Sequence, residues 1–123
     1  MADQLLHVEL VAADRTVWSG DASFILARTT EGEIGILAGH ATLLGQLAEG
    51  FTVTIRRSGG DDLTAAVHGG FLSVTGEQVS ILAENAELSE EIDVARAERA
   101  LESEDEQARA RATARLRAVG QRG

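Results

Sequence analysis

The sequence predicts a mainly β protein with a C-terminal α-helical hairpin: an antiparallel β-sandwich followed by two short antiparallel helices. Two observations carry this prediction. Short segments in which apolar and polar residues alternate, separated by glycine turns, occupy most of the chain. The remainder is dominated by Ala, Glu and Arg, which favour helices. We therefore expect an N-terminal β-sandwich over residues 1–88 and a two-helix hairpin over residues 89–123.

The strands are predicted by apolar residues at every second position, which places them on one face of a strand. Such alternation or β-prone composition occurs at residues 6–10, 23–28, 51–56, 63–67 and 79–84. The turn Ser58-Gly59-Gly60-Asp61 predicts a hairpin between two of these segments, because glycine adopts the positive φ that tight turns need. The turn Thr75-Gly76-Glu77 predicts a second hairpin over residues 70–83. Short strands at this spacing are typical of an antiparallel sandwich or barrel.

The two helices are predicted from their capping residues. Asp93 suits the N-cap of a helix over Val94 to Glu102, with its carboxylate accepting from the Ala95 or Arg96 amide. Ser103 and Glu106 have the spacing of a capping box that starts a second helix. A weak apolar stripe, composed of Ala108, Ala112, Leu116 and Val119, runs along that helix, and Gly120 is expected to end it. Acids concentrate in residues 90–106 and arginines in residues 107–123, so an antiparallel hairpin would bring opposite charges together.

Composition excludes several classes of function. The net charge of −9 opposes binding to a phosphate backbone, so nucleic acid is not an expected partner. The absence of cysteine excludes thiol chemistry and fits a cytoplasmic protein. No apolar run is long enough for a spanning helix, and the N-terminal residues do not resemble a signal peptide.

No catalytic arrangement emerges from the spacing of reactive residues. His7, His40 and His68 lie far apart and lack the spacing of metal ligands, so ordinary surface or satisfied histidines are expected and no metal site. No nucleophile elbow, phosphate-binding glycine loop or acid–base pair is apparent. A small cupin-like metalloenzyme and a free-standing β-sandwich adaptor remain as alternative functions at this point.

Several motifs resemble one family in the same order along the chain. The matching segments are Trp18-Ser19-Gly20, residues 32–44 (GEIGILAGHATLL), residues 66–74 (AVHGGFLSV), residues 79–85 (VSILAEN) and residues 91–97 (EIDVARA). Together they resemble the ε subunit of bacterial F-type ATP synthase over essentially the whole chain. In the family pattern prolines flank the central His, whereas this chain has Ala38 and Thr42, so the loop loses φ restraint. The tail is also shorter than in many members of the family.

The resemblance implies a non-catalytic rotor subunit in the central stalk of a proton-translocating ATP synthase, coupling c-ring rotation to ATP synthesis. It implies that the sandwich binds the γ subunit and the c-ring, that the C-terminal helices reach the catalytic αβ subunits and regulate ATP hydrolysis, and that no cofactor is required. The implied location is peripheral, at the cytoplasmic face of the cell membrane, with membrane contact only through the complex.

The resemblance also assigns partner-binding residues. Glu31, Glu33 and His40 belong to the Glu31 to His40 loop that contacts the c-ring and γ in the family. Glu33 as a solvated loop acid and His40 as an orienting residue of its own loop are the alternatives. In the tail, the arginines suited to acidic partner loops are Arg109, Arg111, Arg115 and Arg117. Simple solubility or charge pairing within the hairpin is the alternative for them.

Some members of the family bind a regulatory ATP at the start of the helical part. The residues of this chain that match the positions concerned are Glu87, Ile92, Asp93, Arg96 and Ala97. Asp93 as a helix cap and Ile92 as a packing residue are alternatives that need no ligand.

Overall fold

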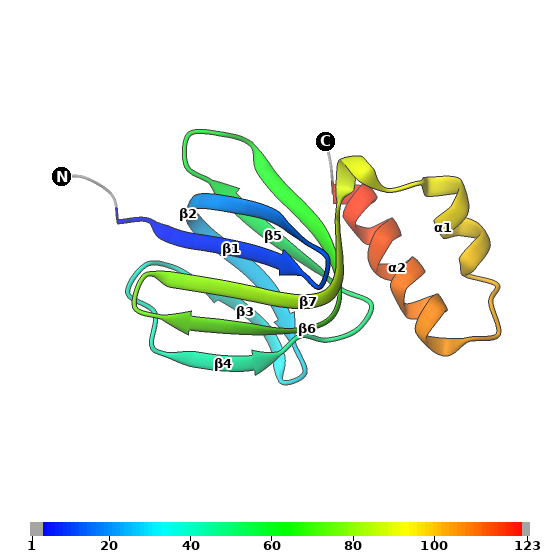
Figure 1. The fold of residues 1–123 in the computed structure, drawn as a ribbon, viewed down its shortest axis with the longest axis horizontal. Coiled ribbons are helices and arrows are strands. Elements are labelled where there is room, and N and C mark those ends of the chain that lie inside the picture. The colour runs from blue at the N-terminus through cyan, green and yellow to red at the C-terminus, as the bar shows by residue number, and fades with distance from the viewer. Residues whose placement is uncertain (1–3, 122–123) are drawn as a thin grey trace.

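The computed structural model describes residues 4–121 and contains a β-sandwich with a helical hairpin at one end (Figure 1). The strands are β1 (Leu6–Ala12), β2 (Arg15–Thr29), β3 (Gly32–Ile36), β4 (Leu43–Gln46), β5 (Thr52–Arg57), β6 (Asp62–Thr75) and β7 (Gln78–Leu88). A single 3-10 turn, η1 (Ser89–Glu91), leads to α1 (Val94–Ala100) and α2 (Glu106–Gln121). The predicted fold class is confirmed.

The sheet closes on itself through its two longest strands. Its strand order is β1-β7-β6-β5-β2-β3, β4 pairs with β6, and β1 also pairs with β2. The N-terminal part of β2 pairs with β1 and its C-terminal part with β5 and β3. Residues 62–66 of β6 pair with β5, residues 65–75 with β7, and residues 71–74 with β4. Since β2 and β6 each belong to both layers, the sandwich is a flattened barrel with few free edges.

Glycine permits β6 to change direction between its two halves. Gly69 has φ +61°, in the left-handed region where a side chain is rarely tolerated. At Gly70 an added Cβ would lie 2.6 Å from the carbonyl oxygen of Leu82 on β7. Gly69 therefore allows the long strand to bend, and Gly70 allows its backbone to lie close to β7.

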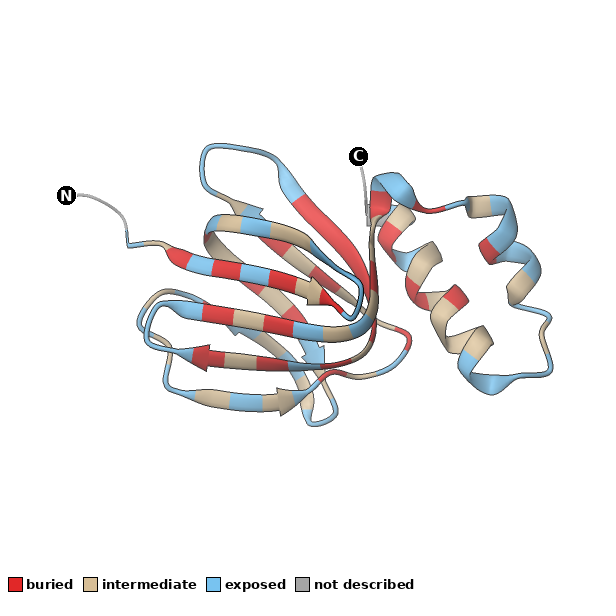
Figure 2. Ribbon diagram, in the orientation of Figure 1, coloured by how far each residue is buried: buried red, intermediate tan, exposed pale blue. Residues whose placement is uncertain are grey.

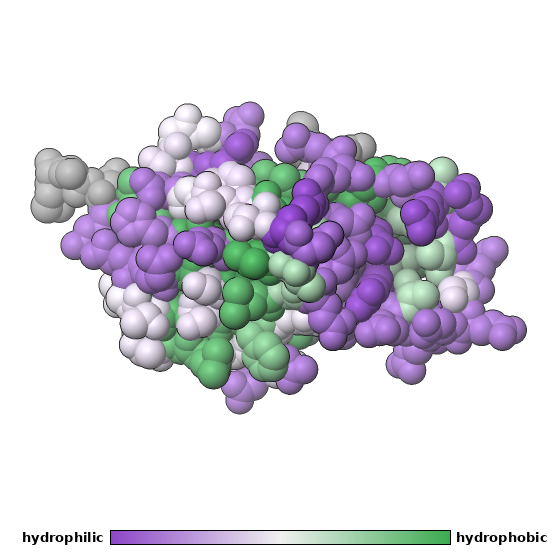
Figure 3. Space-filling view, viewed as in Figure 1, coloured by the Kyte–Doolittle hydropathy of each residue, from purple (hydrophilic) through white to green (hydrophobic). Residues whose placement is uncertain are grey.

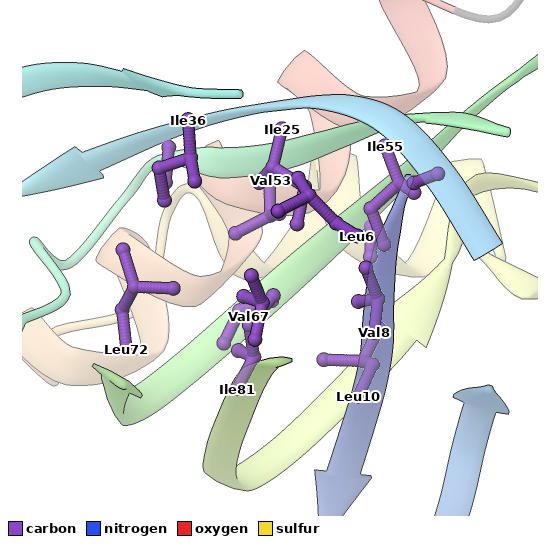
Figure 4. Close-up of a cluster of buried hydrophobic side chains, with 14 of the residues drawn as sticks. Leu6, Val8, Leu10, Ile25, Ile36, Val53, Ile55, Val67, Leu72 and Ile81 are labelled. Atoms are coloured by element: carbon purple, nitrogen blue, oxygen red, sulfur yellow. The ribbon is translucent and has the colours of Figure 1, made fainter. Parts of the chain in front are cut away.

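The core lies between the two layers and follows from the strand period of two. Burial alternates strictly along most of β1, where Leu6, Val8 and Leu10 are buried and His7 and Glu9 are exposed (Figure 2). Apolar side chains from β1, β2, β3, β5, β6 and β7 converge in Figure 4, including Ile25, Ile36, Ile55, Leu72 and Ile81. Each fully buried side chain of this size contributes roughly 1.5–3 kcal/mol relative to an exposed one.

The helical hairpin packs on the sandwich through a second, smaller apolar cluster. Ala114 and Ala118 of α2 are fully buried against Ala66 of β6 and Ile92, with Val119 alongside. These small side chains bury little apolar area, so this cluster is much weaker than the core of the sandwich.

The strand predictions are largely confirmed, with three differences. The hairpin turns at residues 58–61 and 75–77 are confirmed by the gaps between β5, β6 and β7. The segments at residues 63–67 and 70–75 belong to one strand, β6, because Gly69 bends it without ending it. Two strands, β3 and β4, were not predicted, so the segment from Glu31 to His40 is only partly a loop. The pairing of β1 with β7 is parallel, since β1 closes the barrel against a strand running in its own direction.

The helix predictions are partly wrong at the ends. The Asp93 cap is confirmed, because its Oδ1 accepts from the Arg96 amide at 3.1 Å. The first helix ends at Ala100, earlier than expected, and the second begins at Glu106. There the Asp105 carboxylate accepts from the Gln107 amide at 3.0 Å, in place of the predicted Ser103 cap. Gly120 lies inside α2, which continues to Gln121.

Within residues 4–121, no helix is both long and apolar enough to cross a membrane.

Candidate functional site

A hollow of about 600 Å³ lies between the hairpin and β7. It is lined by Asn85, Glu87, Glu91, Asp93, Arg96, Ala97, Ala100, Asp105, Gln107, Ala108, Arg111 and Arg115. The strand β7 supplies the floor, α1 one wall and α2 the other. Carboxylates and guanidiniums therefore converge on a space that neither the sandwich nor the hairpin would form alone.

Four of the five residues matched to a regulatory ATP line this hollow: Glu87, Asp93, Arg96 and Ala97. The fifth, Ile92, is buried in the small apolar cluster against Ala66 and does not line the hollow. Asp93 caps α1 at the same time, so the packing and capping roles of Ile92 and Asp93 are both present in the structure.

Glu87 is the electrostatic centre of the hollow. Its Oε1 lies 2.5 Å from Arg115 Nε and 3.4 Å from Nε2 of His68, which is fully buried on β6. The His68 imidazole and then the Arg115 guanidinium favour the carboxylate form, and together they lower the pKa of Glu87 to about 2 against the opposing effect of burial. Within the described residues neither ring nitrogen of His68 makes a regular hydrogen bond. The sequence did not indicate that this histidine would lie under α2.

The tail arginines contact the sandwich and their own hairpin in different ways. Arg111 Nη2 lies 3.1 Å from Glu84 Oε2, and Arg115 pairs with Glu87, both on β7. Arg109 donates to the Ser103 carbonyl at 2.7 Å. Within residues 4–121 the ion pairs of α2 therefore run to β7 and not to the acids of α1, contrary to the alternative of charge pairing within the hairpin.

Arg117 attaches the far end of α2 to the loop before β5. Its Nη1 donates to the Gly50 carbonyl at 2.8 Å, and its guanidinium carbon lies 4.3 Å from the centre of the Phe51 ring. Arg28 of β2 lies over the same ring at 4.9 Å. Gly50 has φ +82°, a conformation that favours glycine at this close approach to α2.

The three partner residues predicted in the N-terminal part are separate from the hollow. Glu31 is exposed in the turn between β2 and β3, where its amide donates to Thr29 Oγ1 at 3.1 Å. Glu33 is exposed on β3 opposite Arg28. His40 is partly exposed beyond β3, with Nδ1 2.7 Å from the Ala41 carbonyl oxygen, a contact that orients its own loop.

An apolar surface that the sequence analysis did not identify lies on the outer face of β4, β6 and β7. Leu44, Phe71 and Leu82 are 74%, 53% and 53% exposed. Phe71 pairs in register with both Leu82 and Gln46, two residues beyond Leu44 on β4. Figure 3 shows hydrophobic atoms gathered over these strands. The signal was present in the sequence, because these residues are the apolar ones at outward positions of their strands.

A further ion pair, which the sequence did not indicate, joins the start of β2 to η1, the turn that follows β7. Arg15 at the start of β2 contacts Glu91 of η1 through both terminal nitrogens, at 2.9 and 3.1 Å. Arg15 and, secondarily, the Leu88 amide lower the pKa of Glu91, and the same hydrogen bond raises the pKa of Arg15. The pair fixes the chain where the last strand turns into the hairpin.

The three histidines lie on different elements, His7 with Nδ1 2.7 Å from Asp21, His40 in its loop and His68 beneath α2. Over residues 4–121, no group of three or more His, Asp or Glu side chains is arranged to hold a metal ion.

Comparison with known proteins gives a consistent result. The family model described as ATP synthase, Delta/Epsilon chain, beta-sandwich domain matches residues 5–89. The ATP synthase epsilon chain of Streptomyces griseus is 59% identical over 121 residues, covering 95% of this chain and 97% of the relative. That of Mycobacterium avium is 57% identical over 115 residues, covering 94% and 95%.

Solved structures agree with this assignment. A chain in the structure of the Euglena gracilis mitochondrial ATP synthase, OSCP/F1/c-ring, superposes with a TM-score of 0.68 at 26% identity, covering 98% of this chain and 82% of that one. A chain of the Tetrahymena thermophila mitochondrial ATP synthase central stalk and c-ring shows the same fold, with a TM-score of 0.61 at 18% identity over 86% of this chain and 79% of that one. From its strands, its sequence relatives and its fold, the chain belongs to the delta/epsilon family of ATP synthase subunits, as a bacterial epsilon chain.

Proposed function

We propose that this chain is a non-catalytic rotor subunit that binds γ and the c-ring through its sandwich. It then lies peripherally at the cytoplasmic face of the cell membrane, held there by the complex. Membership of the family supports this role, as does the fold shared with a chain of the Euglena gracilis ATP synthase OSCP/F1/c-ring assembly. In this role the chain transmits torque, and other subunits make ATP.

The observation that carries the proposal is the exposed apolar face of Leu44, Phe71 and Leu82. A contiguous apolar patch rimmed by polar residues is typical of a protein–protein interface. It lies on rigid, hydrogen-bonded strands, which suits a surface that must transmit force. We assign it to the γ subunit, and the separate β3 end, with Glu31, Glu33 and His40, to the c-ring and γ.

Substitution of Phe71 tests this assignment. Phe71→Ser should weaken binding to purified γ by at least tenfold, because truncating a residue at the hot spot of an interface costs about 2 kcal/mol or more. Leu101→Ser is the matched control, since Leu101 is also an exposed apolar residue, 41% exposed, but lies at the end of α1. Equal γ affinity of both variants and the unchanged chain would contradict the assignment.

The tail is proposed to regulate ATP hydrolysis by leaving the sandwich and contacting the catalytic αβ subunits. Its support is the construction of α2, which carries Arg109, Arg111, Arg115 and Arg117 and packs on the sandwich mainly through alanines. Guanidiniums pair well with carboxylates, so the released helix suits an acidic surface of the head.

A second proposal is that a regulatory ATP binds in the hollow between the hairpin and β7. The arginines that line this hollow favour it. Arg96, Arg111 and Arg115 line the same space as Asp93 and Ala97, so three guanidiniums lie near enough to contact phosphate oxygens. Glu87 already holds Arg115 and Glu84 holds Arg111, so an anion would have to compete with both pairs.

Binding of ATP is tested by NMR on the full chain. At millimolar ATP, amide shifts should appear around residues 87–97, and Arg96→Ala should abolish them. Arg99→Ala is the control, because Arg99 is exposed on the same helix and does not line the hollow. Absence of shifts in the unchanged chain would leave Asp93 as a helix cap only.

A further inference from the structure

Two residues singled out for different partners lie in one hollow. Glu33, assigned to the sandwich's partner contact, and Arg117, assigned to the tail, both line a space of about 250 Å³ on the outer face of β2, β3 and β5. Arg28, Phe51 and Thr54 also line it. Nothing in the sequence indicated that Glu33 and a residue of the C-terminal helix would line the same hollow.

The strand register explains why the sandwich residues share this face. Arg28 is the register partner of Glu33, so their side chains lie on the same side of the sheet. Leu26 and Thr54, also in register, belong to that side as well. Arg117 joins them from α2, because its hydrogen bond to Gly50 and its contact with the Phe51 ring place its guanidinium over the strands.

The hollow brings two positive side chains, Arg28 and Arg117, close to each other and to one negative side chain, Glu33. The guanidinium carbons of Arg28 and Arg117 lie 4.9 and 4.3 Å from one ring centre, so their separation cannot exceed the sum of those distances. That limit is close to the Debye length of about 8–10 Å in ordinary buffers, so the two cations still repel each other. Within residues 4–121 neither guanidinium has a carboxylate oxygen within 4 Å. Glu33 supplies the one negative charge of the hollow.

From this arrangement we infer that Glu33, Arg28 and Arg117 form a charge junction that couples the β2–β3 end of the sandwich to the docking of α2. The Glu33 carboxylate attracts Arg117 and favours the docked tail, whereas Arg28 repels Arg117 and favours release. A partner that engages the Glu33 carboxylate withdraws the attraction and leaves the repulsion, so it loosens the tail. This step rests on the proposed function, in which Glu33 contacts a rotor partner.

The charge junction itself is tested on the full chain alone, by amide hydrogen exchange of the last turns of α2 at low salt. Glu33→Gln should speed exchange and Arg28→Gln should slow it, each by about twofold, which is the effect expected in water for two single charges at the upper limit of the Arg28–Arg117 separation. Both effects should disappear in an Arg117→Gln background and fade at 1 M salt, where the Debye length is about 3 Å.

Matched substitutions separate the junction from general effects of charge. Glu31→Gln removes an exposed acid two residues from Glu33 that does not line the hollow. Arg56→Gln removes an arginine that also lies over an aromatic ring, Phe24, but elsewhere on the sandwich. Equal exchange for Glu33→Gln and Glu31→Gln, or persistence of the Glu33 effect without Arg117, would overturn the inference.

The coupling to a partner is tested by reciprocity. If the partner loosens the tail, loosening the tail must raise affinity for the partner by the same factor. Arg117→Gln should therefore bind the purified γ–c-ring stalk about twofold more tightly than the unchanged chain. Binding of equal strength would contradict the coupling. Failure of the unchanged chain to bind the stalk would contradict the proposed function and leave the exchange result standing.

Discussion

Glu87 joins the sandwich to the tail through one of the two ion pairs between β7 and α2 described above. Its carboxylate holds Arg115 of α2 and lies beside the buried imidazole of His68. A buried polar group without a regular hydrogen bond costs roughly 1–3 kcal/mol, and a nearby carboxylate offsets part of that cost for His68. The same side chain thus stabilises a residue of the sandwich and attaches the helix that covers it.

We predict that Glu87→Gln loosens the tail. The amide keeps the shape of the side chain but loses the charge, which should cost on the order of 1 kcal/mol of docking free energy. Hydrogen exchange of α2 amides should accelerate about fivefold, while the amides of the sandwich core stay unchanged. Glu84→Gln is the control: that side chain is 70% exposed against 23% for Glu87, so the loss of its pair with Arg111 should have a smaller effect. A larger effect at Glu84 would contradict the assignment.

The lowered pKa of Glu87 also predicts a dependence on pH. The folded value of about 2 lies below the ordinary value of 4.5, so the native protein binds this proton less tightly than the unfolded chain. The stabilisation is therefore fully present above about pH 5 and is lost as the pH falls through 4.5 toward 2. In denaturant titrations the difference in unfolding free energy between the unchanged chain and Glu87→Gln should shrink over this range. A difference that stays constant from pH 6 to pH 3 would show that the charge of Glu87 does not matter.

At the scale of elements, the contact between α2 and β6 is built from small residues. Ala66, Ala114 and Ala118 are fully buried, so the helix backbone lies close to the strand and leaves no space for larger side chains. Close packing makes the contact specific, while the small apolar area keeps it weak. This combination suits an element that docks in one position and can leave it.

Enlarging one alanine should therefore release the helix. Ala114→Leu is expected to cost about 1–3 kcal/mol through overpacking, which exceeds what the alanine contacts contribute. Limited proteolysis should then cut within α2 while the sandwich stays intact. Ala95→Leu, at an exposed position of α1, should leave the cleavage pattern unchanged. Resistance of Ala114→Leu to proteolysis would indicate that the helix is held by its ion pairs instead.

The helices and strands differ in how well they could be predicted from the sequence. Strands with strict alternation, such as β1 and β5, were predictable because one face is buried in the core and the other is exposed. In β3, Ile34 and Ile36 do alternate, but the glycines around them suggested a loop. In α2, the predicted stripe included Ala112, which is fully buried, but it missed Ala114 and Ala118, which are buried to the same degree. A helix made largely of alanine carries almost no periodic signal, so its buried face depends on the partner surface.

The same limit applies to the candidate site. One motif around the start of α1 contains the matched residues Glu87, Asp93, Arg96 and Ala97. The sequence could therefore predict that these residues lie near one another. The meeting of Glu87 with His68 and Arg115 depends on how α2 lies across β7, which no local pattern encodes.

At the scale of the whole molecule, a strongly packed sandwich carries a weakly attached hairpin. The core strands close within residues 6–88, and the contacts that hold the tail in the described part of the chain include a small alanine cluster, two ion pairs from α2 to β7, the Arg15–Glu91 pair and the Arg117 contacts. Exposed and half-buried ion pairs of this kind contribute about 1 kcal/mol or less each. The docked and released states are therefore close enough in free energy for a partner to select between them.

Truncation after Leu88 should leave a folded sandwich that still binds γ. The truncated chain retains all seven strands and the apolar face, and it exposes Ala66 and His68, which water can solvate. A cooperative thermal transition and unchanged γ affinity would confirm that residues 1–88 form an independent domain. An unfolded fragment, or a folded one that ignores γ, would contradict the division of the chain.

ATP hydrolysis by the assembled enzyme should depend on the charged residues that form the ion pairs of α2 with β7. Reversing Arg111 and Arg115 to Glu repels β7 as well as any acidic surface of the head, so the tail is released but cannot engage, and hydrolysis should rise, as we also expect on truncation after Leu88. Reversing their partners, Glu84 and Glu87, to Arg also releases the tail but leaves its arginines intact. Hydrolysis should then fall below that of the unchanged enzyme.

Opposite effects of these two double substitutions separate engagement of the head from simple undocking, because both break the same ion pairs. The measurement requires enzyme shown to contain the variant subunit at normal stoichiometry. If both variants raise hydrolysis equally, the docked hairpin is itself the inhibitory form. If neither changes it, the basic helix is a solvated cover for β7, and another subunit controls hydrolysis.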